Sequence, residues 1–337
     1  MKKGFTLVEL LAVLTLLAFV AIIATPVMEE LLTNSSRKTK DAQVKEIIEA
    51  AKKYVIKYDN EIDYDDDYEA LVSLTDIKKS EFLNDEKMIN AETNEEFNGC
   101  VYVKYNEETG KTSYAYFYNC NTVNDTSGCF TFSNNTVYGF NNTDASCATG
   151  TFTLPTFING KKVRYVEANT TADKAYFANS TKIDFSKALF LERIGEKALG
   201  NIINNYTFFE VLDLSNNSLL KEINDYAFYD EDLKFRTVKF PDNLQNIGVS
   251  AFSDSKITSL VLPEKLDKIG KHAFKNNNLE AIVIPSSVTY LGTEAFYGNR
   301  LLSVTIDGKT AVEDFAYYQT PFAGNDSFAD NKIIWKK

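Results

Sequence analysis

The sequence predicts an α+β chain in three parts: a long N-terminal transmembrane helix, a small antiparallel sheet on which the rest of that helix packs, and a repeat solenoid. Three observations predict it. Residues 5–28 form one apolar run. Residues 44–58 carry an apolar stripe at helical spacing, ahead of an aromatic-rich hairpin. Between residues 237 and 306, short sequence elements recur every 22 residues, and weaker copies precede them at longer steps, which indicates a stacked array rather than an ordinary globular β domain.

The apolar run over residues 5–28 would span roughly 36 Å as a helix, enough to cross a bilayer. It holds one charge, Glu9. An ionisable side chain inside a membrane span is costly, so Glu9 is a candidate functional residue that needs a partner. Lys2 and Lys3 precede the run, and the positive-inside rule therefore places the N-terminus in the cytoplasm and everything after Met28 outside.

Residues 2–11, KKGFTLVELL, resemble the type IV prepilin signature. The resemblance implies that residues 1–4 are a leader, that a prepilin peptidase cuts between Gly4 and Phe5, and that the new amino group of Phe5 is methylated. It also implies that Glu9 pairs with the Phe5 amino group of a neighbouring subunit as a filament assembles, so that two charges costly in lipid meet. The alternative is an ordinary signal-anchor helix.

The helix is expected to continue over residues 29–58, because apolar side chains recur there at steps of three and four. These side chains are Val44, Ile47, Ile48, Ala51, Val55 and Tyr58. Residues 71–83 predict a short helical connection. A long helix that leans its second half on a small antiparallel sheet is the architecture that the pilin resemblance implies.

The acidic run over residues 61–69 could be taken for a calcium loop, since Asp63, Asp65 and Asp67 alternate along it. An EF-hand loop, however, needs Gly where this chain has Tyr68 and Glu where it has Leu74. The pattern therefore favours a solvated acidic loop, and no metal site is predicted.

Four cysteines, Cys100, Cys120, Cys129 and Cys147, fall in the exterior part, where disulfides are permitted. Three pairings are possible in principle. Cys100 and Cys120 bracket two strand-like runs around a Glu-Thr-Gly turn, and a hairpin would bring their ends close. We favour Cys100–Cys120 and Cys129–Cys147. A zinc site is the rival, but the spacings lack a CxxC knuckle and the chain has one histidine.

The repeat is visible in two elements that keep the same 22-residue step. The hexads that begin at Ile247, Ile269 and Leu291 read [IL]-G-x-x-A-F. The strand-like segments 237–241, 259–263 and 281–285 each end in proline, and 303–306 follows in register. Weaker units stand at 194–199 with 183–185 and at 223–228 with 211–214, and the furthest similar segment is 152–155.

This arrangement resembles the BspA-type leucine-rich repeat family. The resemblance covers about residues 150–310 and implies a curved solenoid, in which each unit adds a strand to a parallel sheet on one side and a turn or short helix on the other. The Ile and Phe of each hexad would be buried only when neighbouring units stack. Residues 315–335 depart from the motif and are expected to cap the open end.

Alternation along the strands predicts which side chains point outward. If Leu260, Ile282 and Val304 point inward, then Val261, Val283 and Thr305 point out, with Lys239 one repeat earlier and Asp184 and Asp213 before it. The row Lys239, Val261, Val283 and Thr305 is the candidate ligand-binding face. The competing interpretation is a wetted sheet surface without a ligand.

No catalytic constellation is predicted, and neither is a cofactor. His272 is the only histidine and occupies the slot held by Tyr226, Ser250 and Glu294 in other units, which indicates a variable surface position. Without a further histidine, Ser-His or Cys-His catalysis has no base, and no phosphate-binding glycine loop follows a strand. The net charge of −11 argues against nucleic acid as a partner.

The two resemblances together predict a leader (residues 1–4), a pilin-like domain (5–127, with a small disulfide-bearing head over 59–127) and a leucine-rich repeat domain (128–337). The expected protein is a minor type IV pilin, held in the cytoplasmic membrane before assembly and then displayed on the pilus. Its expected partners are the prepilin peptidase, other pilin subunits and an unknown extracellular protein or surface ligand. The alternatives are a pseudopilin of a secretion or DNA-uptake system and a membrane-anchored receptor that does not polymerise.

Overall fold

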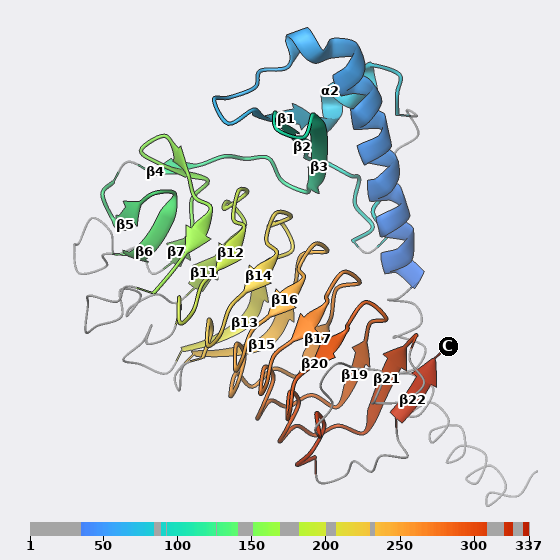
Figure 1. Cartoon of the computed structure of the whole chain (residues 1–337), viewed down its shortest axis with the longest axis vertical. Helices are drawn as coiled ribbons and strands as arrows, with labels where there is room; N and C mark the ends of the chain where they lie inside the picture. The colour runs from blue at the N-terminus through green and yellow to red at the C-terminus, as the bar shows by residue number, and fades with distance from the viewer. Residues whose placement is uncertain are drawn as a thin grey trace, which may run out of the picture. The chain divides into compact units, whose positions relative to one another are not determined.

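The computed structural model describes residues 35–83, 89–91, 93–125, 127–140, 151–168, 182–199, 207–229, 233–308, 320–325 and 333–336 (Figure 1). They belong to two compact units, one ending at Tyr118 and the other beginning at Asn119. The sequence predicts a boundary after residue 127. The division seen in the structure lies nearer the N-terminus, because β4 (Asn124–Asp125) pairs in parallel with β8 (Phe157–Ile158) of the second unit.

The first unit combines a helix with a three-stranded antiparallel sheet. Residues 35–58 are helical, as predicted for that part of the chain, and the 3-10 turn η1 (Asp59–Glu61) follows. The sheet has the order β1 (Glu69–Ser73), β2 (Cys100–Asn106), β3 (Lys111–Phe117), and β2 and β3 form the predicted hairpin. The prediction of a helical connection over 71–83 is partly wrong, because β1 extends to Ser73 and only α2 (Leu74–Lys79) is an α-helix.

The apolar stripe of the helix is buried in the core of this unit. Ile47, Ala51 and Val55 are buried in one cluster with Val101 and Val103 of β2. Val44 and Ile48 pack against the same cluster. Among the described residues, no helix is both long and apolar enough to cross a bilayer. Residues 5–28, where the span is predicted, lie outside them.

The second unit is a solenoid of parallel strands stacked in chain order (Figure 1). Its longer strands pair in parallel in three short sheets, β7–β11, β13–β15–β17 and β19–β21–β22. These strands are β7 (Thr151–Thr153), β11 (Lys182–Asp184), β13 (Thr207–Asp213), β15 (Leu233–Lys239), β17 (Ser259–Val261), β19 (Ala281–Ile284), β21 (Ser303–Asp307) and β22 (Ile333–Lys336). The predicted register of the 22-residue step is confirmed, since Val238 lies beside Leu260 and Ile282 beside Val304.

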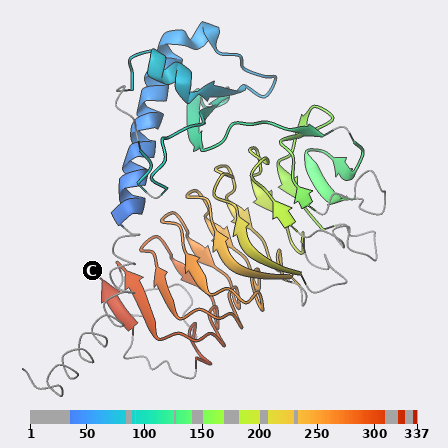
Figure 2. The same cartoon turned by 180° about the vertical axis from the view of Figure 1, so that it is seen from behind.

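A second sheet, which we had not predicted, runs along another side of the solenoid (Figure 2). It is built mainly from two-residue strands that contain the first residue of each hexad, and a hairpin of β5 and β6 closes its N-terminal end. Its members are β5 (Phe130–Ser133), β6 (Thr136–Phe140), β10 (Tyr165–Val166), β12 (Arg193–Ile194), β14 (Glu222–Ile223), β16 (Asn246–Ile247), β18 (Lys268–Ile269) and β20 (Tyr290–Leu291). The short strand β9 (Lys161–Lys162) pairs with β8 outside this sheet.

The phenylalanine of each hexad forms a continuous stack through the core. Phe252 lies 5.6 Å from Phe274 between ring centroids, with ring planes 4° apart, and Phe274 lies 5.3 Å from Phe296. Phe228 and Phe322 extend the stack at its two ends. The predicted burial of Phe274 is confirmed, because its side chain is 0% exposed.

Buried asparagines join successive repeats through their backbones. The Asn299 side-chain oxygen accepts a hydrogen bond from the Leu279 N–H at 3.1 Å, and its amide donates to the carbonyls of Phe274 and Phe296 at 2.9 and 3.0 Å. Asn277 and Asn325 make equivalent bonds. Each amide thus satisfies backbone groups that would otherwise be buried without partners.

The described part of the predicted cap repeats these contacts. Phe322 and Asn325 occupy the phenylalanine and asparagine positions of a further unit. Strand β22 pairs in parallel with β21. The chain therefore continues the solenoid there, although its sequence no longer matches the repeat.

The glycine of the hexad is required by close backbone packing between repeats. A Cβ atom on Gly270 would lie 2.5 Å from the carbonyl carbon of Gly248, and one on Gly292 would lie 2.5 Å from that of Gly270. Such distances are far inside van der Waals contact, and the obstacle is backbone rather than a side chain that could rotate. Any larger residue must therefore push two repeats apart.

We predict that Gly270→Ala destabilises the solenoid by about 1–3 kcal/mol, the usual cost of forcing an extra methyl into a packed core. The measurement is urea unfolding of a chain that begins at residue 35. Lys271→Ala is the matched control, since the Lys271 side chain is exposed and its loss should change the free energy by less than about 0.5 kcal/mol. Equal effects of the two substitutions would contradict the close-approach argument.

Candidate functional site

The residues predicted to act in processing and assembly, Gly4, Phe5 and Glu9, lie outside the described residues. Their roles remain predictions from the sequence. Within the described chain, the candidate site is the exposed side of the longer strands. We call this the outer strand face and define it by the row Asp213, Lys239, Val261, Val283, Thr305 and Ile334.

Strand pairing aligns this row in two groups of three, on two separate sheets whose adjacent strands β17 and β19 are in contact. Asp213, Lys239 and Val261 are register partners on β13, β15 and β17, and Val283, Thr305 and Ile334 are partners on β19, β21 and β22. The residues that precede most of them in the chain, such as Leu260 and Ile282, are buried. The predicted alternation therefore holds on β15, β17 and β19.

The exposure of the row differs from the prediction at one position. Val261 is 47% exposed and Ile334 is 51% exposed, while Val283 is half-buried. Thr305 is only 6% exposed, so its predicted outward position does not make it available to a ligand. The short Thr305 side chain stands on the middle strand between the larger Val283 and Ile334 in register.

The outer strand face changes from charged to apolar along the solenoid, as the sequence predicted. At the charged end, the Lys239 Nζ lies 3.5 Å from a carboxylate oxygen of Asp213, and Arg236 lies 3.6 Å from Glu210. All four side chains are exposed, and surface ion pairs of this kind contribute little to stability. The paired charges neutralise one another. The apolar side chains Val261, Val283 and Ile334 are therefore the part of the face most suited to contact a protein ligand.

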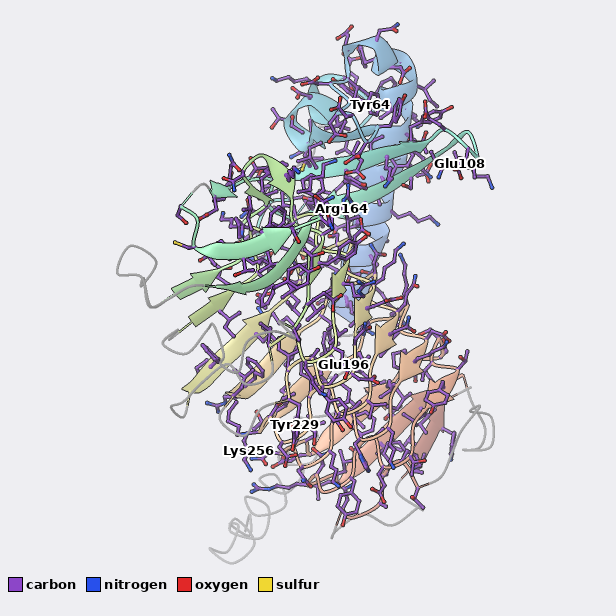
Figure 3. All side chains as sticks on the ribbon, turned by 60° about the vertical axis from the view of Figure 1, so that its left-hand side comes forward. Tyr64, Glu108, Arg164, Glu196, Tyr229 and Lys256 are labelled. Carbon is purple, nitrogen blue, oxygen red and sulfur yellow. The ribbon has the colours of Figure 1, made fainter. Side chains whose placement is uncertain are left out.

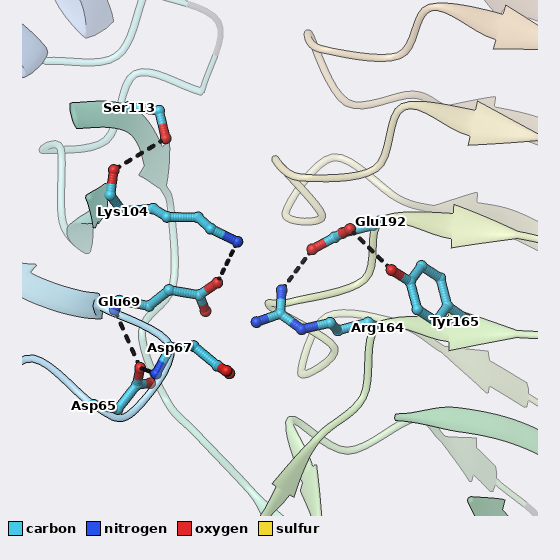
Figure 4. A network of polar contacts seen from close by, with 8 residues as sticks. All are labelled: Asp65, Asp67, Glu69, Lys104, Ser113, Arg164, Tyr165 and Glu192. Atoms are coloured by element: carbon cyan, nitrogen blue, oxygen red, sulfur yellow. Dashed lines mark hydrogen bonds and ion pairs between the residues drawn. The ribbon is translucent and has the colours of Figure 1, made fainter. Parts of the chain in front are cut away.

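The eight-stranded sheet that contains β10 to β20 presents a polar surface, and we call it the polar sheet. Its outward row is Tyr165, Arg193, Glu222, Asn246, Lys268 and Tyr290. Arg193 donates to the Glu167 carboxylate at 2.8 Å and lies 4.8 Å from the centroid of the Tyr165 ring. The Glu167 hydrogen bond raises the pKa of Arg193 further, and beside it Arg164 pairs with Glu192 at 2.5 Å (Figure 4). At this end of the sheet, both arginine side chains are therefore already paired with carboxylates.

The turn side of the solenoid holds the hexad slot that includes His272. Its residues adopt positive φ, including 58° at His272 and 54° at Glu294. The His272 Nε2 lies 2.7 Å from a Glu294 carboxylate oxygen, and the His272 side chain is 22% exposed. Our interpretation of His272 as a plain surface position therefore missed a contact between repeats. The loops after each Ala-Phe pair include the exposed Tyr229 (Figure 3).

The acidic run of the first unit is partly ordered by its own hydrogen bonds (Figure 4). Asp65 accepts from the backbone N–H groups of Asp67 and Glu69 at 2.9 and 3.1 Å. Carboxylate oxygens of these three residues lie within 4.8 Å of one another. Glu69, predicted to lie in a solvated loop, is instead a buried residue of β1 and pairs with Lys104 at 3.0 Å. Asp63 does not belong to this cluster.

Cys100 and Cys120 form a disulfide. Cys129 is also disulfide-bonded. Cys147, its predicted partner, lies outside the described residues. The segment after β3 is thus covalently joined to the first residue of β2.

Two family models match separate parts of the chain. The prokaryotic N-terminal methylation motif matches residues 1–25. The BspA type leucine rich repeat region matches residues 201–322 in six copies. The chain therefore has a type IV prepilin-like N-terminus joined to a BspA-type leucine-rich repeat domain. The predicted resemblances are confirmed.

Two solved structures are similar to the chain at low identity. A leucine-rich repeat protein from Bacteroides ovatus is 16% identical over 70% of each chain, with a TM-score of 0.36. The pneumococcal vaccine antigen PcpA is 14% identical over 60% of this chain and 87% of its own, with a TM-score of 0.24. No curated protein matches. At these TM-scores, neither structure bears on function.

We predict that Val261→Glu with Val283→Glu changes the free energy of unfolding by no more than about 1 kcal/mol, because both side chains reach solvent on the outer strand face. Leu260→Glu, one residue away, should cost several kcal/mol, since it buries a charge without a partner. Urea unfolding of the chain from residue 35 compares the variants. Similar losses in both would show that the valines belong to the core.

Proposed function

We propose that this protein is a minor type IV pilin that displays its leucine-rich repeat domain for adhesion or ligand recognition at the cell surface. One observation carries the proposal: a prepilin methylation motif and a repeat solenoid occur in one chain. The motif supports cleavage by a prepilin peptidase and storage in the membrane before assembly. The solenoid supports recognition, since repeat arrays build extended binding surfaces.

The size of the repeat domain favours a sparse or terminal position in the filament. The second unit extends from Asn119 to the end of the chain. Pilin helices pack closely in a filament, and close packing of identical subunits leaves little room for a head of this size. Immunogold labelling of sheared filaments tests this position.

A pseudopilin of a secretion or DNA-uptake system is the second candidate, because the same motif directs such subunits into their own assemblies. Neighbouring genes for a retraction ATPase favour the pilus, and genes for a secretin with exported hydrolases favour secretion. A membrane-anchored receptor that does not polymerise is the third candidate.

We predict that Glu9→Ala is inserted and processed but enters filaments poorly. Alanine inserts into the membrane more favourably than glutamate, but it leaves the Phe5 amino group of the neighbouring subunit without its counter-charge. Immunoblots of sheared filaments, normalised to the membrane pool, measure this. Gly4→Val is the companion variant and should leave the full-length precursor uncleaved, as intact mass shows. Unchanged incorporation of Glu9→Ala would contradict the pairing of Glu9 with Phe5, whereas absence of the parent protein from filaments would support the non-polymerising receptor.

For the ligand-binding face, we predict that Val261→Glu with Val283→Glu weakens binding to a protein ligand at least tenfold, because two carboxylates must lose water on contact. Gln245→Glu with Asn246→Glu is the matched control, with the same charge change on the polar sheet. A screen of residues 119–337 against extracellular-matrix and cell-surface proteins supplies the ligand. If the valine variant binds as tightly as the parent, the loops after Ala-Phe become the candidate site.

A further inference from the structure

The chain leaves the sheet of the first unit through an edge strand. The sheet order is β1–β2–β3, so among the described strands β3 pairs with β2 alone, whereas β2 pairs on both sides. Phe117, the last residue of β3, pairs with Cys100, the first residue of β2. The chain continues from Phe117 into the repeat domain.

Tension from the repeat domain would reach β3 at this end. An edge strand of a hairpin that is pulled from its free end separates one residue pair at a time, beginning with Phe117 and Cys100 and ending at Lys111 and Asn106. Each step breaks only the bonds of one ladder. Peeling of this kind is the mechanically weak way to load a sheet, since the bonds do not share the load.

The Cys100–Cys120 disulfide changes this path. Tension that arrives at Cys120 passes through the two sulfur atoms to Cys100 and no longer through residues 101–119. Cys100 is 1% exposed and begins the central strand, where Ser73 of β1 and Phe117 of β3 are its partners. To move Cys100, both ladders must break together.

We propose that this disulfide is a mechanical bypass that protects the β2–β3 hairpin when the displayed domain is pulled. The inference rests on the proposed function for its biological purpose, because a subunit fixed in a filament and bound to a surface through its head bears tension. The mechanical property itself depends only on the strand order and the position of the bond.

The test is optical-tweezers unfolding of the full-length chain in detergent micelles, with peptide tags at both ends for attachment. In the parent, no opening of the hairpin should precede unfolding of the rest of the first unit. Cys100→Ser with Cys120→Ser should add an early event at lower force. That event should release roughly 44 Å, the extended length of residues 107–119 at about 3.4 Å each, because β2 stays paired with β1.

Cys129→Ser with Cys147→Ser is the matched control, which removes two cysteines and should keep the parent's pattern in the first unit. If the first double variant fails to fold, adding a thiol reductant to the folded parent in the tweezers gives the same comparison. The proposal is overturned if the first unit opens at the same force, without the early event, once the bond is absent. This assay needs no filament, whereas failure of the pilin assignment would appear as absence of the parent chain from sheared filaments.

Discussion

The backbones of successive repeats run in direct contact at the hexad turn, where a Cβ on Gly270 would lie 2.5 Å from the carbonyl carbon of Gly248. This spacing governs the rest of the solenoid. It lets each Phe ring stack on the next at 5.0 to 5.7 Å between centroids. It also lets buried amides such as that of Asn299 reach the carbonyls of two adjacent repeats. A wider turn would lose both.

Regular stacking also determines what the surface offers. Each residue type at a given slot becomes a row, so a chemical preference repeated along the sequence becomes a continuous face. At the N-terminal end of the polar sheet, Arg193 is engaged by the Glu167 carboxylate and by the Tyr165 ring. On the outer strand face the charged end is self-neutralised, and the apolar end keeps Val261 and Ile334 about half exposed. The exposed apolar end is the basis for proposing the outer strand face as the ligand-binding site.

The first unit connects a helix to the large repeat domain. The helix over residues 35–58 buries its stripe in the cluster that contains Val101 and Val103. The central strand that carries these valines also begins with Cys100 and its disulfide. The strand with the most hydrogen-bonded neighbours is therefore also the one joined covalently to the outgoing chain.

The sequence by itself determined the period, the phase and the buried side of the repeat, because Ile, Ala and Phe recur wherever a stacked unit needs an apolar side chain. It also determined the prepilin motif and the β2–β3 hairpin, which depend on short contiguous segments. Two-residue strands such as β18 were not predicted, since two positions are too few to show an alternation of apolar and polar side chains. The buried position of Asn299 was not predicted either, because the sequence does not distinguish a buried asparagine that bonds two repeats from an exposed asparagine in a turn.

Only the tertiary structure decided properties that depend on neighbours distant in the chain. Thr305 keeps the strand alternation and is nevertheless covered, because register places it between Val283 and Ile334. Glu69 lies in an acidic run but is buried, because β1 pairs with β2 and brings Lys104 to it. The second unit starts at Asn119 because β4 pairs with β8. In each case the deciding contact joins residues that no local pattern relates.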